Sequence, residues 1–114
     1  MSATTLQSLL NKSCQPLAEG TSSLSENKAK ELLMLLPEWD ISTDGKCISR
    51  NYKFKNYYHT TAFVNASSWI SHQQDHHPDI HFSYNQCRIT YSTHSVEGLS
   101  DNDFICAAKT DHLL

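Results

Sequence analysis

Three histidines in this chain of 114 residues stand where they could transfer protons. His76 and His77 are adjacent and are followed by Pro78, and His94 comes later in the chain. Imidazoles are the side chains best suited to exchange protons near neutral pH. Because the ring of Pro78 clashes with an α-helical residue before it, His77 is expected in an extended or turn conformation. The pair is therefore predicted to close a helix and lead into a strand, in a site assembled from the ends of elements.

Apolar spacing and turn residues predict the order helix, two strands, helix, two strands, helix. Helices are expected over 26–36, from about 57 to between 72 and 75, and from Ser100 onward; strands are expected near 39–41 and over 47–54, 80–84 and 87–93. Strands joined by short hairpins, with helices outside them, give an α+β, two-layer fold. Its sheet should be four-stranded and antiparallel, with the helices packed on one face. Residues 1–23 are predicted to form an N-terminal arm, possessing at most a helical turn, and residues 24–114 a single domain.

Residues three and four positions apart define the predicted inner faces of the helices. These faces comprise Ala29, Leu32, Leu33 and Leu36 in the first helix, His59, Phe63, Ala66 and Ile70 in the second, and Phe104, Ala107, Ala108 and Leu113 in the last. Ser25, Asn56 and Ser100 are the expected N-caps, because their side chains can accept hydrogen bonds from free backbone N–H groups.

Composition argues against several classes of function. A formal charge of −3 with scattered Lys and Arg offers no basic stripe for nucleic acid. No stretch approaches the roughly 20 apolar residues of a membrane span. The segment from Met1 to Leu10 lacks the basic and long apolar regions of a signal peptide, so a cytoplasmic location is expected. The four cysteines form no CxxC pair and are expected to be reduced thiols rather than zinc ligands.

Two other kinds of site are alternatives to proton transfer by the histidines. His72 and His76 are four positions apart, a spacing that can hold zinc on a helix, but no HExxH motif accompanies them. Cys87 could serve a Cys–His nucleophilic enzyme, but its place in a strand pattern favours packing as a small apolar residue. Two interpretations of Asp103 remain open: it is either a charge at the start of the last helix or a residue of the site. His59 and His112 are expected to be structural or exposed.

Several motifs in the right order resemble the pterin-4a-carbinolamine dehydratase family, whose animal members are also dimerization cofactors of a homeodomain transcription factor. The motifs are Cys14-Gln15-Pro16-Leu17, Leu24-Ser25, Pro37-Glu38-Trp39, Asp75-His76-His77-Pro78, Tyr84-Asn85, Ile89 through His94, Gly98-Leu99-Ser100 and Asp103. The resemblance covers most of the chain. It departs at His72, where members often have an acidic residue, and at Ile80-His81, where they often have an aromatic pair.

The resemblance implies dehydration of a 4a-hydroxytetrahydropterin to the quinonoid dihydropterin, which recycles the cofactor of aromatic amino acid hydroxylases. On this interpretation His76 and His94 are the acid–base pair, and His77 orients or binds the pterin. The implied substrate-binding residues are Asp75, His76, His77, Pro78, Thr93, His94, Ser95 and Val96. The resemblance implies no cofactor or metal, and a homodimer or homotetramer. The alternative is a non-enzymatic binding module of the coactivator type.

The adjacency of His76 and His77 leads to one further expectation. Charging one imidazole should disfavour charging its neighbour, which would lower the acidic limb of a pH–rate profile below the ordinary histidine value.

Overall fold

The structure is a computed structural model that describes residues 4–114, so the first three residues of the predicted arm lie outside the described part. The helices are α1 (Leu6–Asn11), α2 (Glu26–Leu33), α3 (Tyr57–Gln74) and α4 (Asp101–Asp111), with a 3₁₀ turn η1 (His94–Val96). The strands are β1 (Asp40–Ile41), β2 (Ile48–Lys53), β3 (Asp79–Phe82) and β4 (Gln86–Tyr91). Within residues 4–114, no helix has both the length and the apolar character needed to cross a bilayer.

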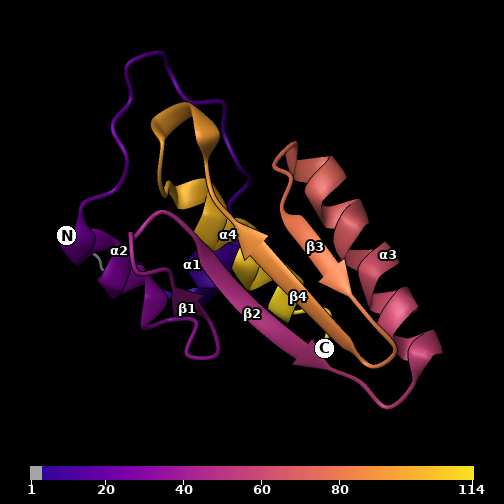
Figure 1. The fold of residues 1–114 in the computed structure, drawn as a ribbon. Helices are drawn as coiled ribbons and strands as arrows, with labels where there is room; N and C mark the ends of the chain where they lie inside the picture. Colours follow the sequence, from indigo (N-terminus) through magenta and orange to yellow (C-terminus); the bar gives the residue numbers. More distant parts are fainter. Residues whose placement is uncertain (1–3) are drawn as a thin grey trace.

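The four strands form one antiparallel sheet in the order β1-β2-β4-β3. Figure 1 shows α1 and α4 behind β2 and β4, and α3 beside β3. The predicted α+β fold, with a four-stranded antiparallel sheet covered by helices, is therefore confirmed. The short β1 and the four-residue β3 are the edges of the sheet.

Alternation along the two central strands separates a core face from a polar face. On the core face Ile48 pairs with Tyr91 and Tyr52 pairs with Cys87, and all four are buried. On the other face the residues are mostly polar and exposed, and Arg88 donates a hydrogen bond of 2.8 Å to the Ser49 hydroxyl. The helices accordingly cover the face that carries the large apolar side chains.

The predicted buried stripe of α3 is wrong by about one position. The buried residues are Thr60, Phe63, Ser67 and Ser71, whereas the predicted His59 is exposed and Ala66 and Ile70 are half-buried. The buried hydroxyls return to the helix backbone: Thr60 Oγ1 donates to the Asn56 carbonyl (2.9 Å) and Ser71 Oγ to the Ser67 carbonyl (3.2 Å). Burial of these hydroxyls therefore leaves no donor unsatisfied, and the Ser71 hydroxyl also lies 3.0 Å from that of Tyr91 in β4.

Smaller differences concern the ends of elements. Helix α2 ends at Leu33, but Leu36 remains buried as predicted because the next turn is closed by a hydrogen bond from Leu36 N–H to the Leu33 carbonyl (2.9 Å). Strand β3 ends at Phe82, since Ser83 N–H bonds the Gln86 carbonyl and begins the turn earlier than predicted. Leu113 was predicted on the inner face of the last helix, but it follows the end of α4 and is 41% exposed.

The C-terminal end of α4 is attached to the sheet by one carboxylate. Asp111 accepts hydrogen bonds from Trp39 Nε1 (3.0 Å), the Arg50 guanidinium (2.9 Å) and the Tyr52 hydroxyl. Its side chain is 23% exposed and that of Arg50 is 21% exposed, so the pair is partly shielded from solvent. The contact joins α4 to β2 and to the segment before β1.

Replacement of Asp111 by Ala should lower the free energy of unfolding by about 2 kcal/mol, because three donors lose a charged acceptor. Urea denaturation of the purified protein measures this loss. Glu38→Ala, at an exposed position before β1, is the matched control and should change stability by less than about 0.5 kcal/mol. Equal losses in the two variants would contradict the role of Asp111.

Candidate active site

The end of α3 places His76. Asp75 caps the helix in the left-handed conformation (φ 51°), which Asp adopts more readily than most residues. The chain then leaves the helix axis, and His76 N–H bonds the Ser71 carbonyl at 3.1 Å. Strand β3 begins at Asp79, directly after Pro78. The prediction that the histidine pair closes a helix and leads into a strand is confirmed.

His76 is bonded to a buried carboxylate. Its Nε2 lies 2.6 Å from Oδ1 of Asp103, whose side chain has no exposed surface. The second oxygen of Asp103 accepts the Thr93 hydroxyl (2.8 Å) and the Ser100 N–H (3.0 Å). An ionised Asp103 requires Nε2 of His76 to carry a proton, so Nδ1 is the nitrogen that can take up or release one.

Two opposing effects act on the pKa of His76. Burial disfavours the charged imidazole, but the hydrogen bond and the negative charge of Asp103 outweigh it, with smaller contributions from Cys14 and Asp75. The pKa of His76 is therefore raised above its ordinary value. This direction is opposite to the lowering expected from the adjacency of His77, because the nearest charged group is a carboxylate and not a second imidazole.

An aromatic ring fixes the plane of the His76 imidazole. The rings of His76 and Tyr91 are parallel within 6°, with centroids 5.7 Å apart. The Tyr91 hydroxyl lies 3.0 Å from Ser71 Oγ on the buried face of α3. The imidazole is thus oriented by Asp103 at one ring nitrogen and by a core side chain over its face.

Four of the predicted site residues line one cavity of about 340 Å³, namely Asp75, His76, Thr93 and Ser95. The rest of its lining comes from residues 14–17 of the arm, together with Gln73, Gln74 and Asn102. The remaining four predicted residues are arranged differently. His94 is exposed on η1 and lines an adjoining cavity that also includes Thr93, whereas His77, Pro78 and Val96 line neither cavity.

The two alternative sites do not fit the geometry. His76 lies beyond the end of α3, so it does not share a helical face with His72, which is exposed and stacked near Trp69 with ring centroids 5.7 Å apart. Among residues 4–114, no three His, Cys, Asp or Glu side chains are grouped to hold a metal ion. Cys87 is fully buried, and burial raises the pKa of its thiol to about 11, which disfavours the nucleophilic thiolate.

Sequence reasoning left Asp103 undecided and did not place Tyr91, Ser100 or the arm in the site. The Ser100-x-x-Asp103 spacing at a helix start was a usable signal, because an acidic residue there can reach the N-cap N–H. Tyr91 is part of the motif from Ile89 to His94 and of a predicted strand, but neither feature indicates a contact with His76. Nothing in the sequence alone showed that the arm returns to α4.

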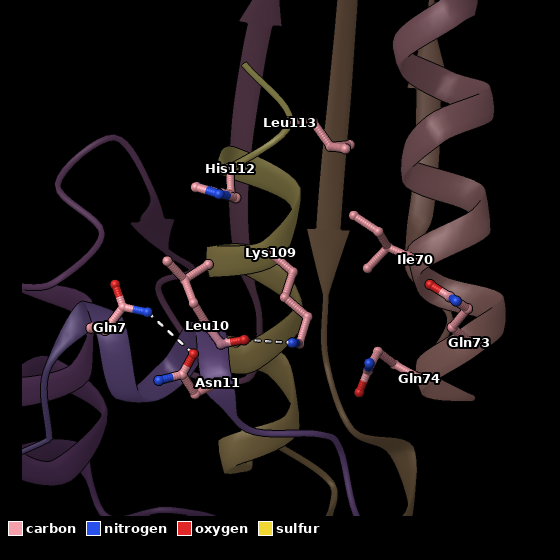
Figure 2. A pocket seen from close by; sticks show the side chains of 9 residues that line it. All are labelled: Gln7, Leu10, Asn11, Ile70, Gln73, Gln74, Lys109, His112 and Leu113. Carbon is pink, nitrogen blue, oxygen red and sulfur yellow. Dashed lines mark hydrogen bonds between the residues drawn. The ribbon is translucent and has the colours of Figure 1, made fainter.

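A second cavity of about 450 Å³ lies between α1, α3 and α4 (Figure 2). It shares Gln73 and Gln74 with the cavity at His76, but it contains none of the eight predicted site residues. The ammonium group of Lys109 is already engaged by the Leu10 carbonyl at 2.8 Å. The grouping of titratable side chains therefore favours the cavity at His76 as the candidate active site.

Comparison with known proteins gives a consistent result. Residues 22–113 match the model of the family described as pterin 4 alpha carbinolamine dehydratase. Proteins of Nitrosomonas eutropha (50% identity, 97% of each chain) and Nitrosospira multiformis (49% identity, 96% of each chain) are similar to it, and both carry the provisional name pterin-4-alpha-carbinolamine dehydratase.

Two solved structures are also similar. A Brucella melitensis protein described as a transcriptional coactivator/pterin dehydratase matches with a TM-score of 0.77 and 28% identity, over 81% of this chain and 98% of that one. A pterin dehydratase-like protein described as a RuBisCO assembly factor in the alpha-carboxysome matches with a TM-score of 0.59 over 67% of this chain and 88% of that one. Its identity of 23% supports a shared fold alone.

The raised pKa of His76 predicts how stability depends on pH. The folded state binds the His76 proton more tightly than the unfolded state does, so this contribution is complete below the unfolded pKa of about 6.5. It is lost as pH rises through the higher pKa of the folded state. The free energy of unfolding should therefore fall more between pH 6 and pH 9 in the wild type than in His76→Gln.

Denaturation by urea at a series of pH values measures the difference. His112→Gln, at an exposed position after α4, serves as the control and should keep the wild-type dependence. If His76→Gln showed the same slope as the wild type, the bond to Asp103 would not favour the imidazolium.

Proposed function

The chain belongs to the pterin 4 alpha carbinolamine dehydratase family, and from this premise we propose that it dehydrates a 4a-hydroxytetrahydropterin. The product would be the quinonoid dihydropterin, and the proposed role is to return the cofactor of aromatic amino acid hydroxylases to use. A cytoplasmic location and a reaction without cofactor or metal belong to the same proposal.

The proposed reaction breaks the bond between C4a and its hydroxyl oxygen and forms a double bond between C4a and N5. Hydroxide is a poor leaving group, so an acid must protonate it to leave as water. The proton on N5 must pass to a base as the double bond forms. Two groups with opposite protonation states are therefore needed, and imidazoles can fill both roles near neutral pH.

The bond between His76 and Asp103 is the observation that carries the proposal. It places an oriented imidazole at the wall of a cavity and favours its protonated form. A protonated imidazole near neutral pH suits the acid that acts on the leaving hydroxyl. We therefore assign His76 as the acid, with Asp103 as the group that stabilises the imidazolium.

His94 is assigned as the base and His77 as a group that binds or orients the pterin. His94 follows Thr93, whose hydroxyl bonds Asp103, so the end of β4 is held to the same carboxylate as His76. His94 itself lies on the exposed turn η1, where a solvent proton can be exchanged. His77 is exposed next to His76, and Asp75, Pro78, Thr93, Ser95 and Val96 complete the proposed binding surface.

The alternative is a binding module without catalysis. The Brucella melitensis protein is described both as a transcriptional coactivator and as a pterin dehydratase, which is why this alternative is considered. A binding surface has no need of an imidazole whose orientation is fixed by a fully buried carboxylate. This pair favours the enzyme.

Replacement of His76 or His94 by Ala should reduce the rate of dehydration by about 10²–10⁴-fold, because each removes a proton-transfer group. The assay follows carbinolamine loss by absorbance, after subtraction of the uncatalysed reaction at each pH. Asp103→Asn should move the alkaline limb of kcat/KM to lower pH, since the imidazolium of His76 loses its charged partner.

His112→Ala is the matched control and should retain wild-type turnover. Wild-type rates in folded His76→Ala and His94→Ala would rule out the acid–base assignment. The absence of dehydration by the wild type itself would favour the binding module.

The assembly that we propose is a dimer formed through the edge strand β3, with further pairing through α3. Edge strands have unpaired backbone groups, and β3 ends at the exposed Phe82 (46%) and is followed by the exposed Tyr84 (63%). On α3, Tyr58 and Trp69 are 78% and 60% exposed. Closed two-fold pairing would cover these groups and fits the common symmetry of homo-oligomers.

Light scattering at micromolar concentration should give a mass at least twice the 12.9 kDa of one chain. Trp69→Glu should lower the mass of any assembly larger than the dimer, because it places a charge in the α3 contact. Met34→Glu changes an exposed apolar residue directly after α2 and should leave the mass unchanged. A wild-type mass of one chain would refute this assembly.

A further inference from the structure

Two cysteines from distant parts of the chain meet beside the candidate active site. Cys14 Sγ in the arm lies 3.5 Å from Cys106 Sγ in α4, and the two residues are 92 positions apart. Both are free thiols. Cys14 is half-buried and lines the cavity that contains His76, whereas Cys106 is fully buried beneath it.

The arm is held so that this contact is maintained. The Cys14 N–H donates to Gln74 Oε1 at 2.7 Å. The next residue, Gln15, exchanges two hydrogen bonds with the Asn102 side chain, at 3.1 and 2.9 Å. Upstream, Lys109 of α4 donates to the Leu10 carbonyl (Figure 2). The arm is therefore held by hydrogen bonds on both sides of Cys14. These bonds keep the Cys14 sulfur next to that of Cys106.

The two thiols differ in their environments. A hydrogen bond from Cys106 lowers the pKa of Cys14, and this effect outweighs burial, which raises it. The charge of a protonated His76 lowers the pKa further, whereas that of Asp103 raises it. The pKa of Cys106 is raised well above its ordinary value by its bond to Cys14 and by burial. Cys14 is thus the member of the pair that lines the cavity and has the lowered pKa, and thiolates are the reactive form of cysteine.

We propose that Cys14 and Cys106 are a redox-sensitive pair that a hydroperoxide converts into a reversible disulfide, locking the arm to α4 at the wall of the cavity. The proposal does not depend on the dehydratase activity, because it concerns the thiols alone.

The reaction is balanced with the hydroperoxide as oxidant. The Cys14 thiolate attacks the terminal oxygen, the O–O bond breaks, and the leaving alkoxide takes a proton to become an alcohol. The product is the sulfenic acid of Cys14. Cys106 then attacks this sulfur, loses its thiol proton, and the sulfenic oxygen departs as water. Two thiols and one hydroperoxide thus give one disulfide, one alcohol and one water.

The second step, attack of Cys106 on the Cys14 sulfur, requires little movement of the two sulfur atoms. The sulfur atoms must approach from 3.5 Å to the disulfide distance of about 2.0 Å, which requires a small movement of the arm over α4. Cys47 is half-buried near β2, and Cys87 is fully buried under the sheet. These two thiols provide matched controls within the same chain.

The test treats the purified full-length protein with hydrogen peroxide, blocks free thiols, and maps the peptides by mass spectrometry. A linkage between Cys14 and Cys106 within one chain is expected, with loss of two hydrogens and reversal by dithiothreitol. The midpoint of thermal unfolding should rise on oxidation by on the order of 10 °C, because the cross-link closes a long loop. Cys47→Ser should behave as the wild type, and Cys14→Ser and Cys106→Ser should lose both effects.

Other outcomes would overturn the proposal. One is oxidation of Cys14 to the sulfinic acid while Cys106 stays a free thiol. Another is cross-linking through Cys47 between chains without the Cys14–Cys106 linkage. Peptide mapping of the wild type decides the matter even if Cys106→Ser does not fold. Dehydratase activity, measured separately, can be present or absent without changing this result.

Discussion

The carboxylate of Asp103 has no exposed surface, and its two oxygens are occupied by donors from three places in the chain. His76 follows α3, Thr93 follows β4, and Ser100 precedes α4. A buried charge is costly unless it is fully hydrogen-bonded, so all three segments must meet for this carboxylate to be accommodated. The fold therefore requires the His76 imidazole in this position, because it satisfies the buried carboxylate. The same contact raises the pKa of His76.

Tyr91 links this carboxylate to the rest of the core. Its ring lies against His76 on one side and has its centroid 6.2 Å from that of Trp39 on another. Trp39 in turn bonds Asp111 at the far end of α4. A carboxylate at a helix C-terminus is opposed by the helix dipole, and here the guanidinium of Arg50 compensates for it. Helix α4 is thus fixed near both ends by aspartates. Asp103 binds the segments that follow α3 and β4, and Asp111 binds side chains of β2, so movement of the site against the core is limited.

The layout of the fold could be predicted from the sequence because helix caps, turn residues and strand alternation all indicate the same order of elements. The buried face of α3 could not, because Ser67 and Ser71 are polar residues whose burial depends on hydrogen bonds to the helix itself. The site was predictable in part. The His76-His77-Pro78 sequence indicates the end of a helix. The hydrogen-bond partner of His76, however, is Asp103, which lies 27 positions later at the start of α4. Such a contact depends on tertiary packing, which local patterns do not encode.

The two parts of the cavity lining are held by different contacts. His76 and Thr93 are fixed to a fully buried carboxylate, whereas the arm is fixed through Gln74, Asn102 and the thiol contact at Cys14. The family match begins at residue 22, so the wall formed by residues 14–17 lies outside the segment that carries the histidines. His76 is thus separate in sequence from the arm residues that line the same cavity. The arm is held by packing as well as by these bonds, since Leu9 of α1 is buried in the hydrophobic core and Leu10 and Cys14 pack against it.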